Sequence, residues 1–133
     1  MNAERATYLD SSAIVKLVVA EEHFVALRAH LRRRRPLVSS ALARTEVIRA
    51  LAPLGARAQG RGGDVLRRID LVRVSDRLLD QAAALRPEHL RSLDAIHLAT
   101  AHHLGATLRQ VVTYDHRMAT AATLLGLPVA TPT

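Results

Sequence analysis

The chain has 133 residues, a formal net charge of +7 and no cysteine. A chain of this length fits one domain, residues 1-133, and the lack of thiols excludes disulfides and cysteine-bound zinc. Any metal would have to bind oxygen or imidazole. The apolar segment 13–20 is too short to span a bilayer, and it fails as a signal sequence because Lys16 interrupts it and Asp10 precedes it. We therefore expect a cytoplasmic protein without a membrane segment.

The positive charge favours a polyanionic partner, such as nucleic acid or an acidic protein segment. Arginine supplies nearly all of it, because Lys16 is the only lysine, and a GC-rich genome would produce the same bias. The four arginines at 32–35 either contact phosphates or form a solvated helix end. The chain has only one Phe, two Tyr and no Trp, so charge rather than base stacking would dominate nucleic-acid binding.

Short apolar runs alternate with segments of helical period along the chain, which predicts an α/β fold with a parallel sheet. The predicted strands are 6–9, 37–39, 71–74, 110–113 and, weakly, 129–130. The predicted helices are 12–20, 22–34, 41–54, 64–68, 76–85, 92–104 and 116–125. The stretch 55–64 holds four glycines and predicts a flexible surface loop.

Residues with capping chemistry stand near the ends of these predicted helices. The predicted N-caps are Ser11 or Ser12, Ser40, Ser75 and Ser92, and the predicted helix stops are Gly55, Gly105 and Gly126.

Four carboxylates, Asp10, Glu46, Asp94 and Asp115, lie in or at the ends of largely apolar elements, where a negative charge is unfavourable unless another group compensates it. Asp10 and Asp115 each follow an apolar strand, and the carboxyl ends of parallel strands border one crevice. Glu46 and Asp94 lie in helices that are otherwise largely apolar or basic. Four acids in one pocket would repel unless a divalent cation compensates, and oxygen ligands suit magnesium or manganese. Such an ion can activate water for attack on a phosphodiester.

Simpler interpretations exist for two of these acids and for a nearby histidine. Asp94 would lie in the first turn of a helix, where the helix dipole favours a carboxylate, and Glu46 could pair with Arg49. His97 follows Asp94 by three residues and could bind a metal or act as a base, but we favour a packed histidine that donates one hydrogen bond. The other acids fall in polar turns or at helix starts.

Four short blocks resemble the signature blocks of PIN-domain ribonucleases, and the VapC-type toxins are the branch they resemble most. The blocks are 8–13 (YLDSSA), 45–46 (TE), 93–101 (LDAIHLATA) and 112–115 (VTYD). Together they extend over almost the whole chain in family order. The resemblance implies a PIN-like three-layer α/β/α domain with a central, mostly parallel sheet of about five strands. It also implies a Mg2+- or Mn2+-dependent endoribonuclease acting on structured or single-stranded RNA, typically tRNA or rRNA.

The resemblance assigns roles to individual residues. Asp10, Glu46 and Asp94 match the three core acids that bind metal and catalyse, and Asp115 matches the fourth, which often acts through water. Ser11 and Thr113 match hydroxyl positions beside the first and fourth acids; each would orient a water or a carboxylate, with an ordinary cap or turn role as the alternative.

The resemblance also implies partners: a cognate VapB-type antitoxin that blocks the acidic groove, and a second copy of the chain in a homodimer. Apolar residues of helices 12–20 and 22–34 would either line a groove for a partner helix or belong to the core. These residues are Val18, Val19, Phe24, Val25 and Leu27.

Three other classes of protein share parts of this pattern. A phosphoacceptor receiver domain needs an acidic pair after its first strand and a late lysine, whereas Asp10 stands alone and Lys16 is early. A haloacid-dehalogenase-type phosphatase needs a second Asp at the position of Ser12. A non-catalytic nucleic-acid-binding module fits the net charge, but it does not explain four acids that face inward.

Overall fold

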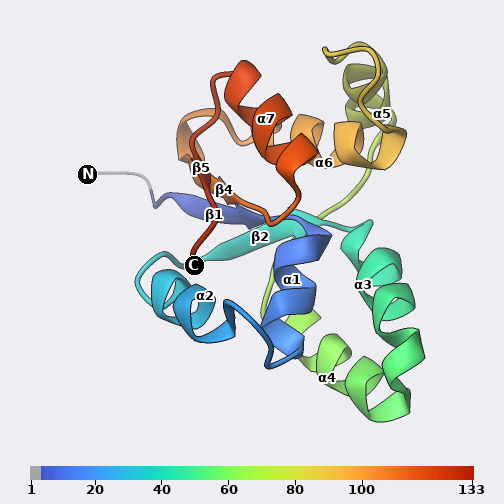
Figure 1. Cartoon of the computed structure of the whole chain (residues 1–133). Coiled ribbons are helices and arrows are strands. Elements are labelled where there is room, and N and C mark those ends of the chain that lie inside the picture. The colour runs from blue at the N-terminus through green and yellow to red at the C-terminus, as the bar shows by residue number, and fades with distance from the viewer. Residues whose placement is uncertain (1–3) are drawn as a thin grey trace.

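The computed structural model describes residues 4–133 (Figure 1). Its sheet has the strand order β3-β2-β1-β4-β5, and every neighbouring pair is parallel. The strands are β1 (Ala6–Leu9), β2 (Leu37–Ser40), β3 (Asp70–Val72), β4 (Leu108–Val112) and β5 (Val129–Ala130). The structure thus confirms the α/β fold with a five-stranded parallel sheet.

Helices cover both faces of this sheet, as Figure 1 shows. They are α1 (Ser11–Val18), α2 (Phe24–Leu31), α3 (Ala43–Leu51), α4 (Ala56–Leu66), α5 (Asp76–Ala83), α6 (Ser92–His103) and α7 (His116–Leu124), with 3-10 turns η1 (Ala52–Leu54) and η2 (Gly105–Thr107). Within residues 4–133, no helix is long and apolar enough to cross a membrane.

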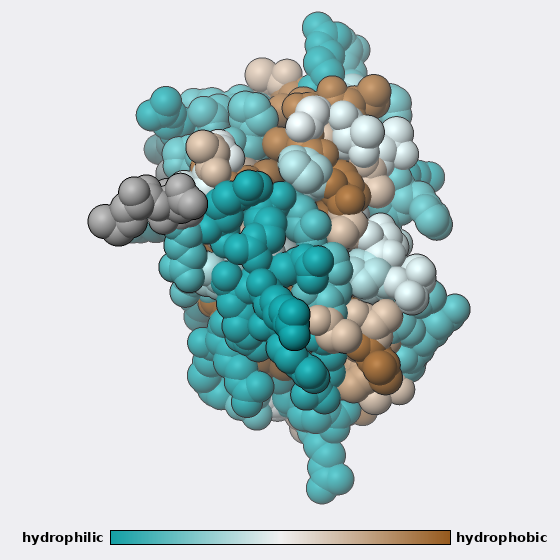
Figure 2. Space-filling model, turned by 90° about the vertical axis from the view of Figure 1, so that its left-hand side faces the viewer, coloured by the Kyte–Doolittle hydropathy of each residue, from teal (hydrophilic) through white to brown (hydrophobic). Residues whose placement is uncertain are grey.

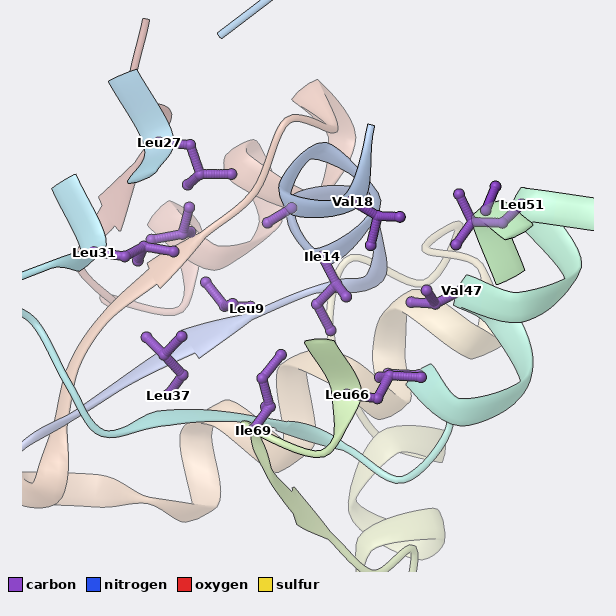
Figure 3. Packing of buried hydrophobic residues seen from close by; sticks show 14 residues of the cluster. Leu9, Ile14, Val18, Leu27, Leu31, Leu37, Val47, Leu51, Leu66 and Ile69 are labelled. Atoms are coloured by element: carbon purple, nitrogen blue, oxygen red, sulfur yellow. The ribbon is translucent and has the colours of Figure 1, made fainter. Parts of the chain in front are cut away.

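Alternate residues of β1 pack on opposite layers, as expected for a strand buried on both faces. Leu9 joins Ile14 and Leu37 in the core beneath α1–α4, and Figure 3 shows these side chains pointing toward one another. Tyr8 and Val38 pack on the opposite face, against Ala101 of α6. The three-layer α/β/α arrangement follows from this alternation.

The strand order places the acids at one edge of the sheet. The chain runs from β1 outward to β2 and β3, then returns to β4 on the other side of β1, with Leu9 beside Val112. In open α/β sheets, ligands bind at the carboxyl ends of strands where the order reverses in this way. Asp10 and Asp115 follow the two strands that flank this reversal.

The prediction of a loop at 55–64 is wrong, because these residues form most of α4, and the helix predicted at 64–68 is only its end. Ala58, Gly62 and Leu66 form the buried side of α4. A Cβ atom at Gly62 would lie 2.5 Å from Leu51 Cδ1, so a glycine is what allows α4 to lie close to α3. Tertiary packing outweighs the poor helix propensity of glycine here.

The cap predictions have mixed outcomes. Ser75 caps α5, accepting a hydrogen bond from Leu78 N at 3.2 Å. The cap of α1 is Asp10 rather than Ser11 or Ser12. Ser92 is the first residue of α6 and not its cap.

Ser40 accepts from Leu42 N at 3.1 Å, but α3 begins only at Ala43, so Ser40 is not its cap. The single helix predicted at 41–54 is α3 followed by η1. Gly105 and Gly126, with φ of 54° and 77°, end α6 and α7 in the left-handed conformation that glycine adopts easily.

Candidate active site

Asp10 is the most buried of the four acids, with 3% of its surface exposed. Its Oδ1 accepts hydrogen bonds from Ser12 Oγ at 2.7 Å and from Ala13 N at 3.0 Å, and its Oδ2 accepts from Thr113 Oγ1 at 2.5 Å. Burial raises the pKa of Asp10, although these hydrogen bonds act in the opposite direction. In the described structure its hydrogen-bond donors are all neutral, so a cation beside this carboxylate would stabilise its charge.

Asp115 caps α7, because its Oδ1 accepts from Arg117 N at 2.9 Å and from Met118 N at 3.3 Å. Thr113 joins this acid to Asp10: it donates to Asp10, and its Oγ1 accepts from Asp115 N at 3.0 Å. Thr113 is fully buried, so it holds the ends of β1 and β4 in a fixed relation.

Arg91 links Asp115 to Asp94. Its Nε donates to Asp94 Oδ2 at 3.0 Å, and its Nη2 donates to Asp115 Oδ2 at 3.3 Å. The Arg91 side chain is 62% exposed, so each pair contributes little to stability. Sequence reasoning missed this residue; its position three residues before Asp94, at the start of the predicted helix, was the available signal.

Glu46 reaches the site from α3 and accepts two hydrogen bonds at Oε1. Ser11 Oγ donates at 2.8 Å and His97 Nε2 at 2.6 Å. Burial alone would raise the pKa of Glu46, but the hydrogen bonds from His97 and Ser11 prevail and hold it below its usual value. The alternative pairing with Arg49 is not seen in the described residues.

His97 is buried, and both of its ring nitrogens are engaged. A carboxylate only accepts, so Nε2 carries the proton toward Glu46, and Nδ1 accepts from the Tyr8 hydroxyl at 2.7 Å. The two rings meet edge to face, with centroids 5.9 Å apart. The expected packed histidine that donates one hydrogen bond is therefore confirmed, and its second nitrogen accepts a further one. Tyr8, to which the sequence analysis gave no role, supports the site.

The structure brings all four acids to one edge of the sheet as two connected pairs. Glu46 accepts a hydrogen bond from Ser11, the residue after Asp10, and Asp94 and Asp115 both accept from Arg91. Within residues 4–133, no three Asp, Glu or His side chains converge closely enough to hold a metal ion as they stand.

The donor set nevertheless fits a hard divalent cation. It consists of carboxylate and hydroxyl oxygens, which are the ligands that Mg2+ and Mn2+ prefer. Asp94 and Asp115 already share one positive group, the exposed guanidinium of Arg91, and Asp10 has none among the described residues. The carboxylates therefore outnumber the cationic groups that pair with them in this arrangement, which favours the binding of a cation.

Comparison with known proteins shows the family to which the chain belongs. The family model described as PIN domain matches residues 7–124. The chain is 56% identical over 127 residues to Ribonuclease VapC46 of Mycobacterium tuberculosis (strain ATCC 25618 / H37Rv), which covers 96% of this chain and 98% of that protein. The chain belongs to the PIN-domain family and, within it, to the VapC group.

Two solved structures have the same fold. The crystal structure of Mycobacterium tuberculosis VapC20, a Sarcin-Ricin loop cleaving toxin, matches with a TM-score of 0.76 and 16% identity, covering 95% of this chain and 99% of that one. A toxin-antitoxin complex from Klebsiella pneumoniae matches with a TM-score of 0.71 and 22% identity, covering 96% and 98%. At these identities the likeness supports the fold alone.

Proposed function

We propose that this protein is an endoribonuclease toxin that hydrolyses phosphodiester bonds of RNA with the help of Mg2+ or Mn2+. The observation that carries the proposal is the linked set of four acids at the reversal of strand order, in a chain 56% identical to a ribonuclease. A non-catalytic nucleic-acid-binding module would not require these acids. The cytoplasmic location expected from the sequence stays a prediction.

The residues that would hold the ion are Asp10, Glu46, Asp94 and Asp115. When bound, the ion neutralises charge on the phosphate and makes water a better nucleophile. Thr113 fixes the Asp10 carboxylate, while Ser11 and His97 fix that of Glu46, so two ligands are oriented before substrate arrives. Asp94 and Asp115, at 14% and 27% side-chain exposure, face the solvent from which RNA would approach.

For the substrate we propose tRNA or rRNA. Purified protein should cut a labelled pool of total tRNA and rRNA into discrete products with Mg2+ or Mn2+, and EDTA should abolish them. The Asp94→Asn variant should bind this pool but leave it uncut. Binding without cleavage by the wild type under either metal would instead favour the non-catalytic module.

We further propose a cognate VapB-type antitoxin and a homodimer as assemblies of this chain. Of the apolar residues considered for a partner groove, Val18 and Leu27 belong to the core, whereas Val25 on α2 is 79% exposed. Beside it, Phe24, Leu17 and Leu31 contribute to a cavity of about 380 Å³ that is rimmed by arginines 28, 32, 35 and 68. An antitoxin segment with apolar and acidic side chains would match this surface.

The side of the molecule that carries α2 is largely hydrophilic, with hydrophobic residues gathered toward the right of the view in Figure 2. Arg32, Arg33 and Arg35 are exposed, so the arginine run lies in solvent and is available to an anionic partner. Val25→Glu, next to Phe24 on α2, should weaken antitoxin binding in calorimetry, whereas Leu54→Glu, at an exposed position on η1, should not. Equal loss in both variants would contradict this location, and sedimentation of the free protein tests the homodimer.

A further inference from the structure

A cavity of about 550 Å³ opens beside Asp94, between α6, α7 and the residues that precede α6. Asp94 and Arg91 line it, so it is continuous with the acidic site. Its volume is in the range of pockets that bind small molecules. We call it the α6–α7 pocket.

The walls of the α6–α7 pocket combine apolar and cationic groups. Leu90, Ala121 and Leu124 provide the apolar part, and Leu124 is 71% exposed in the free protein. Arg91 and Arg117 provide the positive charge, with His89 and His116 beside them. Among the described lining residues, Asp94 is the only acid.

This combination matches the chemistry of a nucleotide. A nucleobase covers apolar surface with its face and stacks on planar guanidinium or imidazole groups, while its phosphate needs a cation. A purely apolar ligand would leave Arg117 without a counter-charge, whereas Arg91 already pairs with Asp94 and Asp115. A free anion would leave the Leu124 wall exposed.

We propose that the α6–α7 pocket binds a nucleotide of the RNA substrate next to the scissile phosphate. The base of this nucleotide lies against Leu90 and Leu124, and Arg117 contacts a phosphate of the RNA backbone. The inference rests on the proposed function and assigns to it a substrate subsite. Because Asp94 belongs to both the pocket and the acidic site, a nucleotide seated here brings the adjoining phosphodiester to the acids.

The test measures RNA binding without cleavage. A fluorescent single-stranded RNA is titrated in EDTA by anisotropy at several salt concentrations. Arg117→Ala removes the phosphate contact and keeps the cap of α7, because Arg117 donates to Asp115 only through its backbone N. Thr120→Trp fills the pocket from an exposed lining position. Arg57→Ala, on the exposed face of α4 outside this pocket, is the control of equal charge.

Arg117→Ala should weaken binding about tenfold and lower the slope of log K against log salt by about 0.7, the value for one phosphate contact on a single strand. Thr120→Trp should weaken binding by a similar factor and leave this slope unchanged, because it blocks the base rather than the phosphate. Arg57→Ala should reproduce the wild type in affinity and slope. If Arg117→Ala matches Arg57→Ala, or if Thr120→Trp binds as the wild type does, the subsite is refuted.

Cleavage assays separate this inference from the proposed function. With metal, both pocket variants should raise KM about tenfold at similar kcat. A wild type that cuts no RNA, with pocket variants that still lose binding, would overturn the nuclease proposal and support the pocket. A wild type that cuts RNA, with pocket variants of unchanged KM, would support the nuclease proposal and overturn the pocket.

Discussion

Replacing His97 with phenylalanine tests how the buried half of the site is held together. The ring keeps its place between β1 and α3, but the hydrogen bonds to Tyr8 and Glu46 are lost. The bond to Glu46 involves a charge and is partly solvated, so its loss costs about 1–2 kcal/mol. Tyr8 is only 1% exposed, and its hydroxyl loses its acceptor, which costs about 1 kcal/mol more.

The cost of leaving the Tyr8 hydroxyl without His97 stays at about 1 kcal/mol, the lower end of the usual range, because Ser39 lies beside this hydroxyl. Ser39 Oγ has no hydrogen-bond partner among the described residues and can accept the bond that His97 gives up. His97→Phe should therefore lower the free energy of unfolding by about 2–3 kcal/mol, and Tyr8→Phe by about 1 kcal/mol.

The double variant distinguishes a hydrogen-bonded pair from two independent packing defects. In urea unfolding followed by circular dichroism, the double variant Tyr8→Phe/His97→Phe should lose free energy of unfolding. This loss should be about 1 kcal/mol smaller than the sum of the losses in the two single variants. In calorimetry without RNA, His97→Phe should weaken Mn2+ binding by about tenfold, as for other residues that orient metal ligands. Strict additivity, or a stability within about 0.5 kcal/mol of the wild type for His97→Phe, would refute the role assigned to His97.

Two further predictions concern packing and pH. Gly62→Ala should lower the free energy of unfolding by about 1 kcal/mol, because crowding against Leu51 outweighs the gain in helix propensity. Gly60→Ala, with open space at its Cβ, should raise it by about 1 kcal/mol. Equal shifts of the two variants in urea unfolding would contradict the close approach of α4 to α3. The pKa of Asp10 is raised above 3.8, so folded protein binds this proton more tightly and stability is lost as pH rises through the folded value. In EDTA at pH 7, Asp10→Asn should therefore melt at a higher temperature than the wild type, and near pH 3 this advantage should vanish; a lower melting temperature at pH 7 would contradict this.

The sequence predicted those parts of the molecule that depend on local pattern. Apolar runs located each strand to within two residues, and the two acids that follow β1 and β4 came together because parallel strands end at one edge. Local propensity failed at α4, because the helix depends on a close contact between Gly62 and Leu51 of α3 that propensity does not register. The bonds from His97 to Glu46 and Tyr8 connect residues 51 and 89 positions apart, so no local signal announces them.

The two pairs of acids differ in how freely they can rearrange. Asp10 and Glu46 are held by Thr113, Ser11 and His97, which are themselves buried or packed between strands and helices, so their carboxylates are fixed by the fold. Asp94 and Asp115 are joined instead by an exposed guanidinium, and separating an exposed ion pair of this kind costs about 0–1 kcal/mol. If Asp94 and Asp115 serve as ligands as proposed, exchanging their contacts with Arg91 for a divalent cation would therefore cost little. The released Arg91 would remain at the border of the α6–α7 pocket, with its positive charge directed to the side from which RNA approaches.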